Sequence, residues 1–179
     1  MLSRSAGRAT AVTLSVWFLA LAASPSARAQ EFGLGRTPRP EEIRRVDISI
    51  PPSGEGLPRG RGTAEQGARI YETQCARCHG ATGVEGPEDV LVGGAGSLAT
   101  AQPIKTVGSY WPYAATLWDY VNRAMPFDRP GTLPADDVYA VVAYMLALNG
   151  IVTDTEILDA TTLPRIHMPN RDGFDSAQD

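Results

Sequence analysis

Cys75-Ala76-Arg77-Cys78-His79 is the stretch that decides how this sequence is interpreted. On a helix, positions 75, 78 and 79 fall on one face, so two thiols and one imidazole can reach a single flat group. A Cys-x-x-Cys-His segment is the attachment sequence of c-type haem, in which the thiols form thioether bonds and the histidine ligates the iron. The segment therefore predicts one covalently bound haem c, held by Cys75, Cys78 and His79.

Three other interpretations of this segment fit the residues less well. A thioredoxin-like redox pair would want a strand before it and usually a proline after it, whereas here Gly80 follows His79. A zinc site needs four ligands, but the chain offers only one further histidine, His167. A disulfide between cysteines three residues apart would close too small a loop to stabilise the fold much.

The sixth ligand of the iron has four candidates in the mature chain: Met125, Met145, His167 and Met168. Met145 belongs to an apolar helix stripe, where methionine is more often core filler, and chemistry alone excludes neither candidate in the tail. Met125 precedes Pro126, where a helix breaks and a loop can turn the thioether inward. We expect Met125 to be the ligand, the alternative being a methionine that fills a core gap. A thioether opposite histidine raises the potential and closes the iron to substrates, which suits electron transfer.

Two further contacts of the haem are expected from the neighbouring loops. The second ring nitrogen of His79 should donate to a backbone carbonyl, which the loop at Gly86-Pro87 is placed to provide. Trp111, Tyr113 or Lys105 could donate to a haem propionate, although aromatic residues of this kind are more often part of the core.

The periodicity of the chain predicts an all-α domain. A helix should begin near Thr63, with Gln66 completing a capping box, and Gly67 and Tyr71 should share its buried face. A second helix should start at Pro112 and carry Leu117, Tyr120 and Val121 on one side. The last helix should span Ala135 to Asn149, with Gly150 as its C-cap. Its apolar stripe is Val138, Val141, Val142, Met145 and Leu148.

Four segments follow from composition. Residues 1–29 read as a signal peptide that is cleaved after Ala29, which predicts a periplasmic protein without a membrane-spanning segment. Residues 30–62 are a Pro/Gly-rich N-terminal extension, expected to be extended rather than packed. Residues 63–150 form the expected haem domain, and residues 151–179 a C-terminal extension expected on its surface. The net charge of −4, with a single lysine, makes nucleic acid an unlikely ligand.

Taken together, these motifs resemble class I cytochrome c over about Thr63 to Gly150. Longer strings are similar to the cytochrome subunit of sulfane dehydrogenase of the bacterial sulfur-oxidising system, and to cytochrome subunits of periplasmic sulfite dehydrogenases. These strings run from Val107 to Ala114, from Leu117 to Phe127 and from Met168 to Phe174. The resemblance implies the class I cytochrome c fold, with Cys75, Cys78, His79 and Met125 at the family's haem positions.

The resemblance also implies a function. In that family the cytochrome takes electrons from a molybdenum-cofactor subunit and passes them to a soluble cytochrome, or onward to a terminal oxidase, without substrate chemistry of its own. Sulfane dehydrogenase cytochromes commonly carry a second haem domain, whereas this chain has one motif, so the substrate of the partner stays open. The alternatives are an independent diffusible carrier, and an enzyme or gas sensor with an open iron site.

Overall fold

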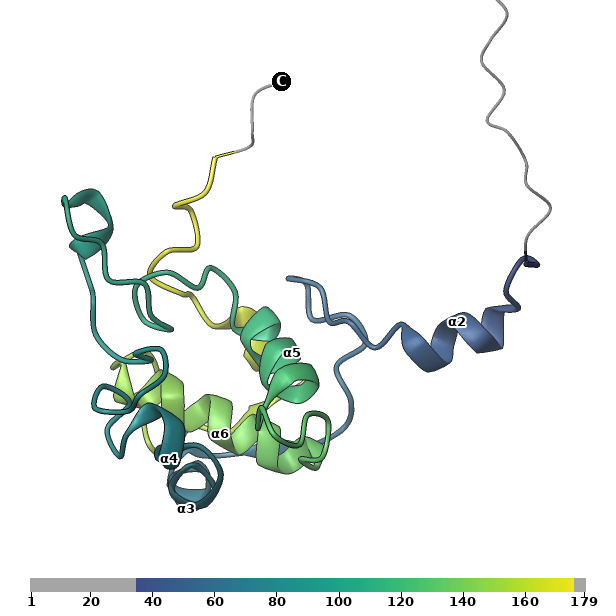
Figure 1. Ribbon diagram of the computed structural model, residues 1–179, viewed down its shortest axis with the longest axis horizontal. Helices are drawn as coiled ribbons and strands as arrows, with labels where there is room; N and C mark the ends of the chain where they lie inside the picture. The colour runs from purple at the N-terminus through teal and green to yellow at the C-terminus, as the bar shows by residue number, and fades with distance from the viewer. Residues whose placement is uncertain (1–34, 176–179) are drawn as a thin grey trace, which may run out of the picture. The chain divides into compact units, whose positions relative to one another are not determined.

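The computed structural model describes residues 35–175, and the expected signal peptide therefore lies outside the described residues. The fold is mostly helical with one small two-stranded sheet, which confirms the predicted class (Figure 1). The elements in chain order are α2 (Pro40–Val46), β1 (Arg61–Gly62), α3 (Ala64–Gln74), α4 (Ala76–His79), η1 (Ser97–Ala99), α5 (Ala114–Ala124), α6 (Ala135–Leu148), β2 (Leu158–Asp159) and η2 (Leu163–Arg165).

Helix α3 begins as predicted. Thr63 is its N-cap: the Thr63 hydroxyl accepts from the Gln66 amide, and the Gln66 side chain accepts from the Thr63 amide. Gly67 and Tyr71 are both buried on the face that packs against α6. A Cβ on Gly67 would overlap the Ala140 carbonyl, so the absence of a side chain lets the two helices touch backbone to backbone.

Helix α6 packs against α5 as well as against α3, and these helices surround the core (Figure 1). Helix α5 begins at Ala114 rather than at Pro112, because Tyr113 is extended and serves as the N-cap. Helix α6 ends at Leu148, one residue short of the prediction, and Gly150 follows it with a φ of 69°. Most of the predicted stripe of α6 is buried, while Leu148 is only half-buried.

The sequence predicts that the C-terminal extension lies on the domain surface, but the structure buries part of it. Leu158, Leu163 and Met168 are fully buried and belong to the same core as α5 and α6. Strand β2 pairs antiparallel with β1, with Gly62 opposite Leu158 and Arg61 opposite Asp159. The apolar side chains of the tail are spaced too irregularly to show a helix or strand period, so their burial left no pattern to detect.

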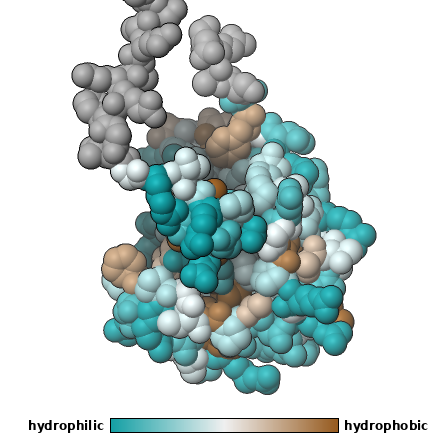
Figure 2. Space-filling view, turned by 90° about the vertical axis from the view of Figure 1, so that its right-hand side faces the viewer, coloured by the Kyte–Doolittle hydropathy of each residue, from teal (hydrophilic) through white to brown (hydrophobic). Residues whose placement is uncertain are grey.

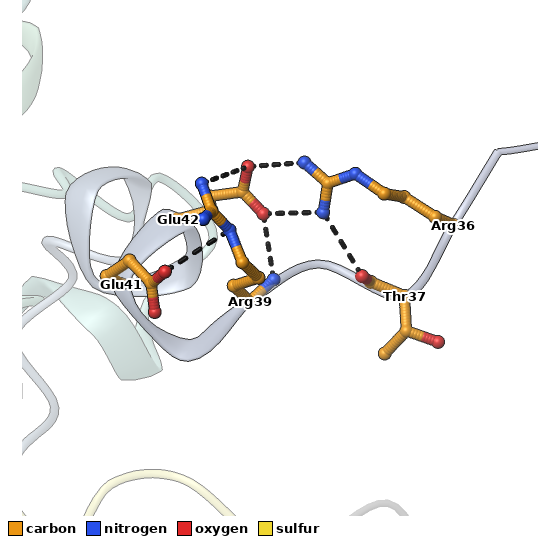
Figure 3. Close-up of polar contacts among 5 residues, drawn as sticks. All are labelled: Arg36, Thr37, Arg39, Glu41 and Glu42. Atoms are coloured by element: carbon orange, nitrogen blue, oxygen red, sulfur yellow. Dashed lines mark hydrogen bonds and ion pairs between the residues drawn. The ribbon is translucent and has the colours of Figure 1, made fainter.

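The extension before α3 is not wholly extended either, because it contains α2. Acidic side chains occupy the first turn of this helix and basic ones its last turn, which favours the helix through its dipole. Figure 3 shows the contacts at its start, where the Arg36 guanidinium donates to both carboxylate oxygens of Glu42 and the Arg39 amide donates to one of them at 2.8 Å. The hydrogen bonds from Arg36, and then from Arg39, lower the pKa of Glu42 to about 2.

Further along the extension, Ile50 is buried in the core. Its amide donates to the Asp119 carboxylate of α5 at 2.8 Å, and that carboxylate also accepts two hydrogen bonds from Arg123. The segment between α2 and β1 is thus attached to the helical domain through a charged acceptor.

The surface seen in Figure 2 is mostly hydrophilic, with hydrophobic side chains showing as separate small patches. Single exposed apolar residues of this kind are normal on a folded domain. Within residues 35–175, no helix combines the length and the apolar character needed to cross a bilayer.

Candidate haem site

The Cys-x-x-Cys-His segment lies at the break between α3 and α4. Cys75 ends α3, with its amide bonded to the Tyr71 carbonyl at 2.8 Å. Its own carbonyl accepts from the amides of Cys78 and His79, both at 3.0 Å, so the chain makes one further tight turn. This turn brings the side chains of Cys75, Cys78 and His79 to the wall of one cavity.

That cavity has a volume of about 610 Å³. One wall is the cysteine segment with Tyr71, and the opposite wall comes from α5, α6 and the loop before α5. The apolar lining includes Val90, Leu91, Val107, Leu117, Val121, Val141, Met125 and Met145. Leu117, Tyr120 and Val121 all line it, as their three- and four-residue spacing on one helix face predicts.

His79 is oriented by a backbone carbonyl, but not by the one expected. Its Nδ1 lies 2.8 Å from the carbonyl oxygen of Asp89, and not against Gly86-Pro87. Gly86 instead packs directly on the Cys78 carbonyl, where a Cβ would overlap it, and Glu88 N–H donates to the same carbonyl at 3.0 Å. The loop therefore first folds back on the cysteine segment, and the carbonyl that faces the imidazole comes three residues later. Nε2 is left as the nitrogen that can bind iron.

The Cys75 thiol lies in an environment that disfavours its ionised form. Burial, and then the charge of Cys78, raises the pKa of Cys75 to about 11. Redox-active Cys-x-x-Cys pairs instead depend on a lowered thiol pKa. Cys75 is therefore poorly suited to be the attacking thiolate of such a pair.

The structure separates the four candidates for the sixth ligand. Met125 is the extended C-cap residue of α5 and lines the cavity, as does Met145 of α6. In the described part of the chain, neither tail candidate lines it, because His167 is exposed and Met168 is buried elsewhere in the core. Two methionines thus remain at the site.

Polar contacts connect the loop after Met125 to the cysteine segment. Arg77 forms an ion pair with Asp128 at 3.7 Å, and Arg129 donates to the side chain of Gln74. These groups are largely exposed, so each contact contributes little to stability on its own.

Of the three expected propionate donors, two lie at the cavity. Lys105 and Trp111 line it, and the Trp111 ring also packs edge-on against Tyr120 with 5.6 Å between centroids. Tyr113 is not among the described lining residues, and its ring instead faces the Arg171 guanidinium at 5.1 Å.

The donor set fits a haem. Two thiols, one oriented imidazole and two thioethers line a single cavity whose walls are largely apolar. One-electron iron chemistry is what a haem supplies when bound. A helical domain built in this way is a c-type cytochrome.

Comparisons with known proteins agree. The family model described as cytochrome c oxidase, cbb3-type, subunit III matches residues 62–145. A chain in the crystal structure of the sulfane dehydrogenase SoxCD from Paracoccus pantotrophus is 43% identical with a TM-score of 0.74, covering 83% of this chain and 73% of that chain. A search of curated proteins gave no match. The chain belongs to the class I cytochrome c family and contains a monohaem cytochrome c domain related to SoxCD, with covalently bound haem c as its cofactor.

Sequence reasoning missed several residues that shape the site. Asp89 acts through its backbone, so its side chain gave no signal. Asn149 ties the loop that follows Asp89 to the end of α6, but an asparagine just after a helix is expected to act only as a local cap. The apolar stripe predicts Met145 to be core filler, and it is both buried and part of the cavity wall.

Proposed function

We propose that this chain is the electron-accepting subunit of a periplasmic molybdenum sulfite or sulfane dehydrogenase. It takes single electrons from a molybdenum-cofactor subunit and passes them to a soluble cytochrome or a terminal oxidase. It transfers electrons and does no substrate chemistry of its own.

The observation that carries this proposal is that Cys75, Cys78, His79 and Met125 all line one cavity. Cys75 and Cys78 would hold the haem through thioether bonds, and His79 and Met125 would supply the two protein ligands of its iron. A histidine and a thioether leave the iron without an open position for substrate, and they favour a raised potential. Both properties suit a carrier rather than an oxygen-activating enzyme or a gas sensor.

The sequence identity to the SoxCD chain is what supports a dehydrogenase partner. The tail supplies core side chains such as Met168, so its presence needs no partner to explain it. An identity of 43% extends over 83% of the chain, which is well beyond the haem domain alone. The likeness therefore includes segments outside the electron-carrying core.

Co-purification tests the partnership. The full chain, tagged and expressed in its native host, should bring down a molybdenum protein, and either sulfite or a protein-bound sulfane sulfur should reduce its haem. A Cys75→Ser/Cys78→Ser variant controls for tag-mediated recovery, because any retained dehydrogenase should then lack the haem absorbance change. A cytochrome recovered without molybdenum, and not reduced by either substrate, would instead be a diffusible carrier.

Location is tested separately. We propose export with cleavage after Ala29, supported by the charged head, apolar stretch and small-residue site of residues 1–29. Amino-terminal sequencing of the haem-stained periplasmic protein should begin at Gln30. A haem protein that keeps residues 1–29 and sediments with membranes would contradict this.

A further inference from the structure

The carbonyl that faces His79 belongs to a loop that is tied to its surroundings on both sides of Asp89. On the side before Asp89, the loop is tied to the cysteine segment through Glu88 N–H and the Cys78 carbonyl. On the side after Asp89, it passes through Gly93 and Gly94, whose φ angles are 95° and 74°. Two consecutive glycines in this region make the backbone locally permissive, so the position of Asp89 depends on what holds the chain between it and Gly93.

Several contacts hold this stretch: the Leu91 amide donates to the Gly83 carbonyl at 2.8 Å, the Leu91 carbonyl accepts from the Val107 amide at 3.2 Å, and the Gly93 carbonyl accepts from the Thr106 hydroxyl at 2.6 Å. Asn149 adds the contact that comes from the end of α6. The Asn149 Nδ2 donates to the Leu91 carbonyl at 3.1 Å and to the Met145 carbonyl at 2.9 Å, and its Oδ1 accepts from the Gly93 amide at 3.1 Å. Both amide hydrogens and the carbonyl oxygen are thus used. Gly108 packs against this amide so closely that a Cβ there would overlap it.

The chemistry of this clamp is specific to asparagine. The site needs two donors and one acceptor in a short, planar group. Aspartate would lack both donors and would face two carbonyl oxygens, and leucine would fill a similar volume without any hydrogen bond. The clamp joins α6, whose Met145 lines the cavity, to Leu91, which lies two residues beyond the Asp89 carbonyl.

We propose that Asn149 is a positioning residue for the proximal histidine. It acts through Leu91 and Gly93 to hold the Asp89 carbonyl against His79 Nδ1, and thereby sets the orientation and basicity of the imidazole. This inference rests on the proposed role of His79 as haem ligand, and it adds a residue far along the chain to the control of that ligand.

The test compares Asn149→Leu with Asn170→Leu in the haem-loaded cytochrome. Asn170 also donates one amide hydrogen bond to a backbone carbonyl, that of Tyr110 at 2.8 Å, but it does not touch the Asp89 loop. Asn149→Leu should speed hydrogen exchange at His79 Nδ1, followed by nitrogen-15 magnetic resonance of the reduced protein, by at least tenfold. It should also raise the midpoint potential, because a less basic imidazole stabilises oxidised iron less. Asn170→Leu should change neither quantity.

The proposal is overturned if Asn149→Leu lowers the melting temperature while ring exchange and midpoint potential match those of Asn170→Leu. Should leucine prevent haem incorporation, Asn149→Ala removes the same hydrogen bonds without adding branched carbons and is judged by the same criteria. The cytochrome is reduced chemically in all of these measurements, so they do not depend on a molybdenum subunit. If the cytochrome failed to accept electrons from such a subunit, the proposed function would be contradicted, but the comparison of the asparagine variants could still be interpreted.

Discussion

At the scale of single residues, the site offers two thioethers and needs one. Met145 lies within the third turn of α6 and is 4% exposed, so its side chain is confined by the core. Met125 is half-buried and extended, at the point where α5 ends before Pro126. The Met125 side chain is less confined by the core than that of Met145 and can turn toward a bound group, which favours Met125 as the ligand.

Substituting each methionine in turn tests this choice. Met125→Ala should abolish the far-red sulfur-to-iron charge-transfer band and let the reduced protein bind carbon monoxide, because the sixth position is then free. Met145→Leu conserves volume, should lower stability by less than about 1.5 kcal/mol, and should leave the band unchanged. Absorbance spectra of both variants show which methionine binds the iron. If Met145→Leu lost the band and Met125→Ala kept it, Met145 would be the ligand.

At the scale of elements, the crossing of α3 and α6 depends on missing side chains. An exposed helical glycine gains up to about 1 kcal/mol of stability when replaced by alanine. At Gly67 the sign should reverse, because the new methyl group would meet the Ala140 carbonyl. We expect Gly67→Ala to lower the free energy of unfolding by about 1–3 kcal/mol, as overpacking usually does. Denaturant titration of the haem-loaded protein measures this, and a stabilised variant would show that the helices do not touch there.

The attachment of the Ile50 segment to α5 predicts a dependence on pH. Burial alone would raise the pKa of Asp119, but hydrogen bonds from Arg123 and from the Ile50 amide outweigh it and lower that pKa below its ordinary value. A carboxyl whose pKa is lower in the folded state stabilises the fold fully above its ordinary pKa. It loses this contribution as the pH falls through the folded value.

Asp119→Asn should therefore destabilise the protein at neutral pH by about 1.5–3 kcal/mol, the range for hydrogen bonds to a charged group. The difference from the wild type should shrink as the pH falls through the folded pKa of Asp119, measured by denaturant titration at several pH values. Asp128→Asn removes an exposed carboxylate that also faces an arginine, and should change stability by less than about 1 kcal/mol. Equal effects of the two variants would contradict a special role for Asp119.

The elements also show which features could be predicted from the sequence. The capping box at Thr63 and the apolar stripe of α6 depend on residues three and four apart, so both were visible in the chain. The cysteine segment was visible for the same reason, because helix spacing is local. The helix break at Pro126 is local too and made Met125 a candidate; Met125 lines the cavity, and its role as ligand stays a prediction. The carbonyl that accepts from His79 could not be predicted. Its identity depends on how the loop turns back at Gly86, where the backbone packs on the Cys78 carbonyl.

At the scale of the whole molecule, the C-terminal segment supplies a strand and core side chains to the helical domain. Strand β2 pairs with β1 directly before α3, and Leu163 and Met168 complete the core beside α5 and α6. Pairing between segments this far apart depends on the assembled fold, so two-residue strands and isolated apolar side chains gave no periodic signal. The haem domain and the tail therefore make one core, although composition alone divided them.

Met168 and His167 allow the role of the tail to be measured with adjacent residues. Met168 is fully buried, so Met168→Ala should leave a cavity and lower the free energy of unfolding by about 2–5 kcal/mol. His167 is exposed, and His167→Ala should change it by no more than about 0.5 kcal/mol. Neither side chain lines the haem cavity in the described part of the chain, so both variants should keep the spectrum of the wild type. If Met168→Ala instead lost the far-red band while remaining folded, the tail would supply the iron ligand, and the assignment of Met125 would have to be abandoned.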